Sequence, residues 1–351
     1  MALIFSDSFD DRPIASIGDR YSAHQYNVSA GSAIAAGRTG NGLVLSTGIL
    51  DVFDHITFDF SSRQSVYVGV ARRDPGESTA LCSIRLNGIP HIFAQLNDNS
   101  TVSVINYDGG LNTILATSSQ TVPQGEFFYV ELYGKIDPIV GAYELRIDGT
   151  RWLSASGVDT SSDGSSLANQ VRLIYNHSSV DGHLTTVDDF YIADDDADGG
   201  DALIVGFAGP VKIACLEETG AGASTEWTPL SGTNVSNLDD GAATGKDDDT
   251  TYNATLTEGA ADLFAIDPFS VVGATVKAVA VHQWCKKMDA TSRSVKPLAY
   301  VSPTEYSGDE TALGTTYARV FHAFERNPAT GAAWTRAEVA AAQFGIALAE
   351  A

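Results

Sequence analysis

The stretch Tyr143-Glu-Leu-Arg-Ile-Asp-Gly-Thr-Arg-Trp-Leu153 decides the fold class of this chain. Its first five residues alternate between apolar and charged side chains, which is the period of a strand with one buried face. Asp148-Gly149 follows, and Asp-Gly supplies the positive φ angles that a two-residue hairpin turn requires. The stretch therefore predicts an antiparallel hairpin with Tyr143, Leu145 and Ile147 on its buried face.

Short runs of the same kind recur through residues 1–195, with turn signals such as Asn87-Gly88 and Asp108-Gly-Gly110 between them. A spacing of roughly ten residues is typical of an antiparallel sandwich. We therefore predict a jelly roll over residues 1–195. Its further strands are expected at Val66–Ala71, Leu81–Leu86, Ile89–Leu96, Thr101–Asn106, Asn112–Thr117, Phe127–Tyr133, Gln170–Tyr175 and Val187–Ala193.

An acidic, glycine-bearing connector, Asp194-Asp-Asp-Ala-Asp-Gly-Gly-Asp201, precedes a second module over residues 200–351. Residues 217–262 are poor in aliphatic side chains, so we expect an ordered loop there. Its anchors would be Trp227, Leu230, Val235 and Tyr252. Strands are expected at Leu203–Phe207, Val211–Leu216, Val276–Trp284, Val295–Val301, Thr315–Glu325 and Phe344–Leu348. The alternation in one of these strands is expected to turn Val276, Ala278, Ala280, His282 and Trp284 inward.

The clearest helix start lies near the C-terminus, after the turn Asn327-Pro-Ala-Thr-Gly331. Thr335 and Glu338 match a capping box, and Trp334 and Val339 are spaced as a hydrophobic staple around it. The fold class predicted for the whole chain is therefore all-β. It comprises two jelly-roll-like β-sandwiches, the second of them smaller and carrying one short helix near the C-terminus.

The chain has 351 residues, 44 acidic and 21 basic, and a net charge of −23. Such a surface repels nucleic acid and anionic membranes at long range, so neither is expected as a partner. The N-terminus lacks the pattern of a signal peptide, and no run is long enough to span a membrane. Cys82, Cys215 and Cys285 are odd in number and lie among apolar residues. This favours buried free thiols and synthesis in a reducing cytoplasm.

The carboxylates are the first candidates for catalytic residues. A retaining glycosidase needs two carboxylates about 5 Å apart. Glu126 and Glu131 are five residues apart, so they fall on opposite faces of a strand, and the adjacent Glu217 and Glu218 also point apart. No nucleophile elbow, zinc-protease motif or phosphate loop is present. The sequence therefore predicts no catalytic residues and no enzyme.

Metal and sugar sites have weak signals in this sequence. His177 and His183 flank an Asp-Gly turn without a third ligand, and His282 is expected to be a hydrogen-bonded core residue. The clusters Asp194–Asp198 and Asp247–Asp249 offer oxygen ligands for structural calcium, although neither matches an EF-hand. We predict no cofactor and no metal-binding residue, with structural calcium as the alternative. Aromatic residues that could stack on a sugar, or fill the core instead, are Tyr21, Tyr26, Tyr107 and Trp152.

The first module resembles the concanavalin A-like, laminin-G-like jelly rolls. The residues that carry this resemblance are Phe5-Ser-Asp-Ser-Phe-Asp10, Gly125–Leu132, Tyr143–Trp152 and Val187–Ile192. In such folds the first and last strands pair, so the two ends of the module are expected to meet. The fold hosts lectins, glycosidases and plain structural modules, so it does not select a function.

Nearly the whole chain resembles a family of tailed-phage virion proteins, through Gly220–Trp227, Asp249–Tyr252, Ala278–Lys287 and Asn327–Gly345. The resemblance implies a non-enzymatic structural component of a virion, at the tail tip, in a fibre or on the capsid surface. Its partners would be other virion proteins, further copies of itself in a trimer, and host surface glycans. The alternatives are a host-polysaccharide depolymerase and a free carbohydrate-binding module.

Overall fold

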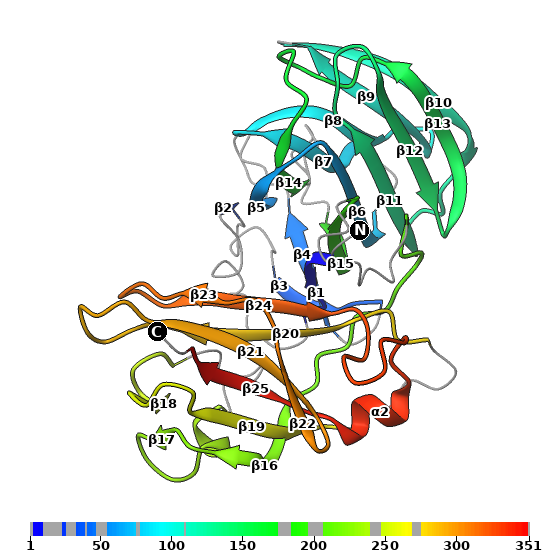
Figure 1. Ribbon diagram of the computed structural model, residues 1–351. Coiled ribbons are helices and arrows are strands. Elements are labelled where there is room, and N and C mark those ends of the chain that lie inside the picture. The colour runs from blue at the N-terminus through cyan, green and yellow to red at the C-terminus, as the bar shows by residue number, and fades with distance from the viewer. Residues whose placement is uncertain are drawn as a thin grey trace. The chain divides into compact units, whose positions relative to one another are not determined.

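The computed structural model describes most of the chain. The described residues are 3–9, 23–25, 33–38, 41–46, 55–74, 78–108, 110–174, 184–195, 206–238, 247–268 and 275–349. They form two compact units. Unit 1 comprises residues 1–196 and 205–214, and unit 2 comprises residues 197–204 and 215–351. Both units consist almost entirely of strands, as Figure 1 shows, and this confirms the predicted all-β fold class.

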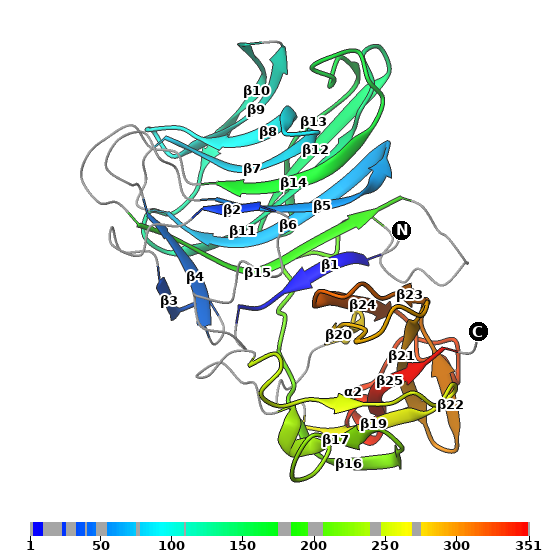
Figure 2. The ribbon, with the colours of Figure 1, turned by 90° about the vertical axis from the view of Figure 1, so that its left-hand side faces the viewer.

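Unit 1 is a sandwich of two antiparallel sheets. The eight-stranded sheet has the order β13 (Thr150–Val158), β12 (Gly141–Ile147), β11 (Phe127–Lys135), β6 (Ser65–Arg73), β15 (Leu184–Asp194), β4 (Asn41–Ser46) and β3 (Ala33–Ala36), with β1 (Leu3–Asp7) also paired to β15. The seven-stranded sheet has the order β10 (Leu111–Thr121), β9 (Thr101–Asp108), β8 (Ile89–Leu96), β7 (Thr79–Leu86), β14 (Ala168–Ile174), β5 (His55–Arg63) and β2 (Ala23–Gln25). Figure 2 shows β8, β7, β14 and β5 one above the other.

The turn chemistry of the sequence sets the register of the hairpins. Asp148 and Gly149 both adopt positive φ, at 49° and 76°, and join β12 to β13 as predicted. Asn87 and Gly88 do the same between β7 and β8, at 48° and 87°. Positive φ at both central residues matches the right-handed twist of the flanking strands. These two turns therefore place the strands as the sequence predicts.

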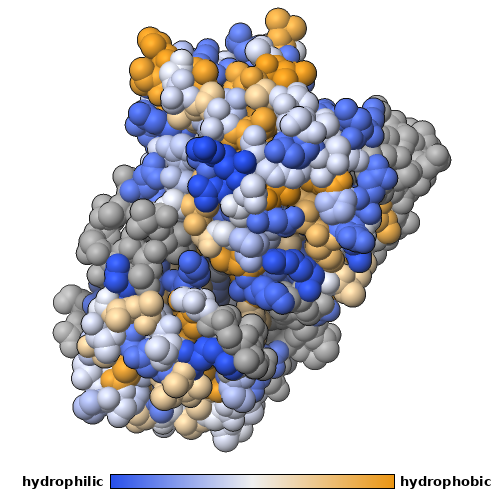
Figure 3. Space-filling view, turned by 90° about the vertical axis from the view of Figure 1, so that its right-hand side faces the viewer, coloured by the Kyte–Doolittle hydropathy of each residue, from blue (hydrophilic) through white to orange (hydrophobic). Residues whose placement is uncertain are grey.

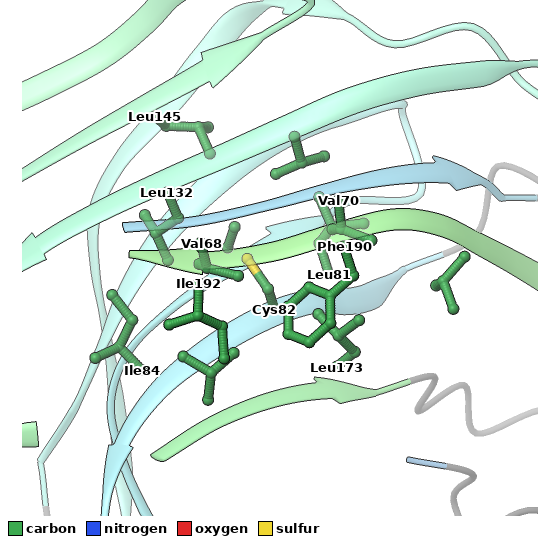
Figure 4. Packing of buried hydrophobic residues seen from close by; sticks show 14 of the residues in the cluster. Val68, Val70, Leu81, Cys82, Ile84, Leu132, Leu145, Leu173, Phe190 and Ile192 are labelled. Atoms are coloured by element: carbon green, nitrogen blue, oxygen red, sulfur yellow. The ribbon is translucent and has the colours of Figure 1, made fainter. Parts of the chain in front are cut away.

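Apolar side chains from both sheets fill the interior of unit 1. Figure 4 shows Val68, Val70, Phe190 and Ile192 of the eight-stranded sheet beside Leu81, Cys82, Ile84 and Leu173 of the seven-stranded one. All of them are buried. Tyr143, Leu145 and Ile147 also belong to this core, which confirms the buried face predicted for their strand. Burial of each such side chain contributes about 1.5–3 kcal/mol.

The first and last strands of the jelly roll pair, as the resemblance to laminin-G-like folds implies. β1 runs antiparallel to β15, with Leu3 opposite Ala193 and Asp7 opposite Phe190. Phe5 stacks on Phe58 with ring centroids 4.2 Å apart and meets Phe190 edge-on at 5.7 Å. The paired ends are therefore also locked by aromatic packing from the opposite sheet.

One ion pair lies inside the sandwich. Arg72 follows Val66, Val68 and Val70 on the inward face of β6, and its side chain is fully buried together with that of Asp74. Its Nε and Nη2 donate to the two oxygens of Asp74 at 3.0 and 2.7 Å. Nη1 also donates to the Leu81 carbonyl on β7, in the opposite sheet. Arg72 thereby links the two sheets.

Unit 2 is a smaller sandwich. Its main sheet has the order β16 (Glu218–Thr225), β19 (Ala261–Ile266), β25 (Gln343–Leu348), β21 (Ser294–Val301) and β22 (Thr304–Ser307), with β23 (Thr311–Ala312) also paired to β21. A separate ribbon pairs β20 (Val279–Cys285) with β24 (Ala318–Phe324). Two short strands, β17 (Thr228–Pro229) and β18 (Asn253–Ala254), and a 3₁₀ turn at Val235–Asn237 complete it. Val281 and Phe324 of the ribbon pack with Ala299 and Phe344 of the main sheet.

The predicted capped helix is α2, Arg336–Ala341. Thr335 accepts a hydrogen bond from the Glu338 amide at 3.2 Å, and the Glu338 carboxylate accepts one from the Thr335 amide at 2.7 Å. Trp334 and Val339 are buried in the same cluster, which confirms the staple. The hydrogen bond from the Thr335 amide holds the pKa of the Glu338 carboxyl below its usual range.

Three expectations for the second module are wrong. Residues 206–217 contain no strand, so the strand predicted at Val211–Leu216 is absent, while most of the strand predicted at Leu203–Phe207 lies outside the described residues. β16 lies where a loop was expected, because its glycines permit close approach: a Cβ on Gly222 would lie 2.5 Å from the Leu263 carbonyl oxygen. Cys215 is exposed rather than buried, while Cys82 lies in the core.

The inward face predicted for β20 is also wrong. Val281 is buried and Val279 packs beside it, whereas His282 is exposed. The ring of His282 packs edge-on against Phe321 on the neighbouring strand, with centroids 4.9 Å apart. The valines are larger aliphatic groups than the alanines that alternate with them, so they occupy the interior.

Replacing Asp74 tests the role of the buried ion pair. Asp74→Ala is expected to lower the free energy of unfolding by about 3–5 kcal/mol, because it leaves the Arg72 charge buried without a counter-ion. Urea denaturation measures this loss. The exposed Glu126, in the turn before β11, provides the control, and Glu126→Ala should change stability by less than about 0.5 kcal/mol. Equal losses in the two variants would contradict a structural role for the pair.

Candidate functional site

The outer face of the seven-stranded sheet carries a cluster of polar side chains outside the core. We call the following residues the arginine face: Thr57, Asp59, Ser83, Arg85, Gln170 and Arg172. They come from β5, β7 and β14, which are adjacent in the sheet. Each alternates with core residues, such as Ile84 beside Arg85 and Leu173 beside Arg172. The period of two therefore turns all six side chains away from the core.

Strand register brings these residues together from distant parts of the sequence. Arg172 lies directly opposite Ser83 on one side and Thr57 on the other. Gln170 lies opposite Arg85 and Asp59 in the same way. Adjacent strands are about 4.8 Å apart, so the two arginines are diagonal neighbours on one face.

Arg172 is held by one end of its guanidinium group. Its Nε donates to Thr57 Oγ1 at 2.9 Å, while its terminal nitrogens make no hydrogen bond within the described residues. The side chain is half-buried, and burial lowers its pKa, an effect that nearby Asp59 opposes. The anchored Nε fixes the plane of the group. The other edge remains available as a fork of two donors.

Arg85 is more completely bound to the protein. One terminal nitrogen donates to Ser83 Oγ at 3.4 Å and the other to the Gly88 carbonyl in the hairpin turn. Burial and the positive charge of Arg172 lower the pKa of Arg85 to about 10, while Tyr107 acts in the opposite direction. Two neighbouring cations that are partly removed from water repel each other. An anion bound between them would relieve this repulsion.

A single carboxylate belongs to the arginine face. Asp59 is exposed and accepts a hydrogen bond from Gln170 Nε2 at 2.6 Å. No ion pair joins it to either arginine among the described residues. The face therefore has one negative and two positive side chains, a local excess of positive charge on a chain whose net charge is −23.

The apolar strip consists of Phe93, Ile105 and Ile114, on β8, β9 and β10. Ile105 lies opposite both Phe93 and Ile114, and Phe93 lies opposite Ser83 of the arginine face. Ile114 is 62% exposed, although Ile105 is buried. Figure 3 shows that hydrophobic residues also gather at the surface elsewhere, at the top of that view. Apolar side chains beside charged groups suit a molecule with both an apolar face and an acidic group.

His91 lies on the outer face of β8 and is fully buried by the 159–167 loop. Its Nδ1 accepts a hydrogen bond from the Ser162 amide at 3.0 Å, so Nε2 carries the proton and donates to the Leu167 carbonyl at 3.0 Å. Burial lowers the pKa of His91, which keeps the ring neutral. His91 therefore fixes a loop at the margin of this face.

The metal sites considered from the sequence gain no support from the described part of the chain. It contains no group of three or more His, Cys, Asp or Glu residues that could hold an ion. Asp194 forms an ion pair with Arg63, and Asp249 pairs with Lys286 at 2.6 Å. His177, His183, Asp196 and Asp198 lie outside the described residues. Structural calcium stays a prediction without a test.

Other candidate residues have separate positions. Trp152 packs partly buried against the core of unit 1, and Tyr107 is half-buried near Arg85. Tyr21 and Tyr26 lie outside the described residues. Glu126 is exposed before β11, Glu131 is buried on the outer face of the eight-stranded sheet, and both Glu217 and Glu218 are exposed. The sequence search missed Arg85 and Arg172 because it sought paired acids.

No helix among the described residues is long and apolar enough to cross a membrane.

No family model matches this chain, and no curated protein matches its sequence. Among solved structures, alginate lyase Aly36B shares 13% identity over 54% of this chain and 95% of its own, with a TM-score of 0.40. The PL-14 alginate lyase from Aplysia kurodai shares 9% over 55% of this chain and 100% of its own, with a TM-score of 0.43. Carbohydrate-binding module CBM66 from Bacillus subtilis shares 9% over 46% of this chain and 92% of its own, with a TM-score of 0.33.

These findings overturn the prediction that the chain is not an enzyme, because the similar structures include alginate lyases. The prediction rested on missing glycosidase carboxylates and missing nucleophile motifs. A lyase breaks its substrate by elimination and needs neither of these.

The buried His91 predicts a pH dependence of stability. Its pKa is lower in the folded state than in the unfolded chain, so its contribution to stability is present above about pH 6.5 and is lost as the pH falls below it. The loss should approach about 1.4 kcal/mol per pH unit. Urea denaturation of the unchanged protein and of His91→Gln at several pH values isolates the contribution of His91 to the free energy of unfolding. An unchanged difference between the two proteins from pH 7.5 to about 5 would contradict it.

Proposed function

We propose that unit 1 binds an acidic polysaccharide, and that Arg172 and Arg85 hold the carboxylates of its uronate residues on the arginine face. The observation that carries this proposal is the state of Arg172, whose Nε is anchored to Thr57 while its terminal nitrogens make no hydrogen bond within the described residues. A planar fork of two N–H donors matches the two oxygens of a carboxylate.

The large negative charge of the chain does not prevent this binding. At physiological ionic strength, interactions between exposed charges are screened beyond about 8 Å. A bound carboxylate would therefore respond mainly to the charges next to it, which are Arg85, Arg172 and Asp59. The long-range repulsion between the acidic chain and an acidic polymer would slow their association. The affinity would then depend on contacts within the arginine face and not on non-specific attraction.

The apolar strip gives the site room for the uncharged part of a sugar. Phe93 is half-buried and is separated from Arg172 by one strand, β7. An aromatic ring packs against the apolar face of a pyranose, while the acidic group of the same or the next residue reaches the arginines. A chain of sugars lying across the strands would contact both parts.

Removing the anchored arginine tests binding. Arg172→Ala should weaken binding to alginate or polygalacturonate by at least about tenfold, because it removes a bidentate charge-assisted pair. Arg172→Lys should restore only part of the affinity, since lysine lacks the planar fork. Isothermal titration calorimetry with each polymer, and with neutral dextran as the reference ligand, measures the effect.

The matched control is Arg151→Ala, which removes the same charge from an exposed position on β13 of the other sheet. It should bind as the unchanged protein does. Equal weakening in both variants would show that binding depends on non-specific charge and not on the arginine face. Absence of binding by the unchanged protein would refute the proposal.

Tyr107 lies on β9, separated from Arg85 of β7 by one strand, β8, and its place in this sheet favours a second function, polysaccharide lysis by elimination. An arginine bound to the uronate carboxylate makes the proton on the neighbouring carbon more acidic. The deprotonated phenol oxygen of Tyr107 would take that proton, and the electron pair of the broken carbon–hydrogen bond would form a carbon–carbon double bond as the bond to the leaving sugar oxygen breaks. The Tyr107 hydroxyl would then donate the same proton to the leaving oxygen.

This second function predicts a separation of binding from turnover. Tyr107→Phe should retain affinity within about threefold while losing at least about 100-fold in rate, which is the usual contribution of a general base. Mass spectrometry of the products would reveal unsaturated oligosaccharides. Products that carry an added water, or equal rates for the two proteins, would contradict this role of Tyr107.

The resemblance to tailed-phage virion proteins supplies a setting for such a site. We propose that the chain is a virion component, assembled with copies of itself, whose unit 1 contacts an acidic polysaccharide on the host surface. This setting rests on the residues that carry the resemblance in unit 2, such as Asn327–Gly345.

A further inference from the structure

A segment after the acidic connector lies on the outer face of the eight-stranded sheet. We call Gly206–Ile213 the strap; it belongs to unit 1 and forms no strand. The Ala208 amide donates to the Tyr191 hydroxyl at 3.2 Å, and the Gly209 amide donates to Glu131 Oε1 at 2.8 Å. The sheet thus binds the backbone of the strap through side chains.

The far end of the strap is held by an arginine and an aspartate. The Ile213 amide donates to Asp189 Oδ1 at 2.7 Å. Arg38 Nη1 donates to the Val211 carbonyl at 2.7 Å and lies 3.1 Å from Asp189 Oδ2. The guanidinium of Arg38 also lies over the ring of Tyr129, 5.2 Å from its centroid. Arg38 therefore connects the Val211 carbonyl of the strap with Asp189 and Tyr129 of the sheet.

One side chain of the strap enters the contact. Phe207 meets Tyr67 edge-on with ring centroids 5.1 Å apart. The guanidinium of Arg146 lies over the ring of Phe207, 4.1 Å from its centroid. An aromatic ring that contacts both a phenol and a guanidinium contributes apolar burial and a cation–π contact. Lys212 is exposed and takes no part.

Two opposing contributions to the free energy act on the contact between the strap and the sheet. Glu131 is fully buried, and its Oε2 has no hydrogen-bond partner within the described residues. Covering a carboxylate oxygen without a donor costs free energy that undocking of the strap would recover. The hydrogen bonds and the Phe207 contact favour docking. The core beneath consists mainly of buried aliphatic and aromatic residues.

We infer that the outer face of the eight-stranded sheet is a peptide-docking surface, which binds the strap reversibly and releases it while unit 1 stays folded. The surface recognises three backbone amides, the carbonyls of Val211 and Pro210, which both accept from Arg38, and one aromatic side chain of the strap. Its occupant is residues 206–213 of this chain. Release would lengthen the connection to unit 2 by the eight residues of the strap, at up to about 3.3–3.6 Å per residue.

The charged and titratable groups facing Glu131 are Tyr191, Tyr129, Arg146 and Glu144. Burial raises the pKa of Glu131 above its ordinary value, and the hydrogen bonds from Tyr191 and Gly209 oppose this only in part. The docked state thus holds a proton on Glu131 more tightly than an undocked state with Glu131 in water. Docking should therefore weaken as the pH rises through the raised pKa.

Hydrogen exchange of the full chain, read by mass spectrometry, tests the inference. Peptides covering 206–213 should exchange faster than those covering β6 and β11, under conditions where the core stays protected. Arg38→Ala and Phe207→Ala should each speed exchange of the strap by about tenfold and leave the core unchanged. Arg151→Ala, on the same sheet, is the matched control and should change neither. After correction for intrinsic rates, strap protection should fall with rising pH.

A synthetic peptide with the sequence of residues 206–215 provides the second measurement. Added to the Phe207→Ala protein, it should bind and shield Glu131 and Asp189 peptides from exchange. Exchange of strap and core at one common rate in all variants would overturn the inference, because the strap would then open only when unit 1 unfolds. Absence of peptide binding would overturn the docking surface itself.

Discussion

The relative position of the two sheets of unit 1 depends on Arg72. Its side chain is fully buried at the end of the inward row of β6, is neutralised by Asp74, and donates to the Leu81 carbonyl of β7. A buried charge tolerates little displacement, since losing either partner leaves an uncompensated ion. β7 is thereby fixed against the other sheet. Because β7 also carries Ser83 and Arg85 and pairs with β14, the same constraint positions the arginine face.

The two outer faces of unit 1 differ in what covers them. The face of the eight-stranded sheet lies under the chain's own strap, and its polar groups, Glu131 and Asp189, are matched to backbone amides. On the arginine face, Arg172 keeps donors without a partner among the described residues. A sandwich has two outer faces, so one can bind a segment of the same chain while the other stays uncovered by it.

Local signals in the sequence predicted the hairpins, the buried face of β12 and the capped helix correctly. Asp148-Gly149 and the pair Thr335 and Glu338 act within a few residues, so their chemistry is visible in the sequence. The buried face of β20 could not be predicted in this way. Packing against β21 and β25 decides whether Val281 or His282 points into the interior. The arginine face was missed for a related reason. Arg85 and Arg172 meet only through the pairing of β7 with β14.

The antiparallel pairing of β1 with β15 has a consequence for how such a chain can change. Leu3 lies opposite Ala193, so the polypeptide enters and leaves the jelly roll at nearly the same point. A module with adjoining ends can be inserted into a surface loop of another protein, or exchanged for a different sandwich, without rerouting the host chain. Recombination could therefore replace the jelly roll while the C-terminal sequence remains constant.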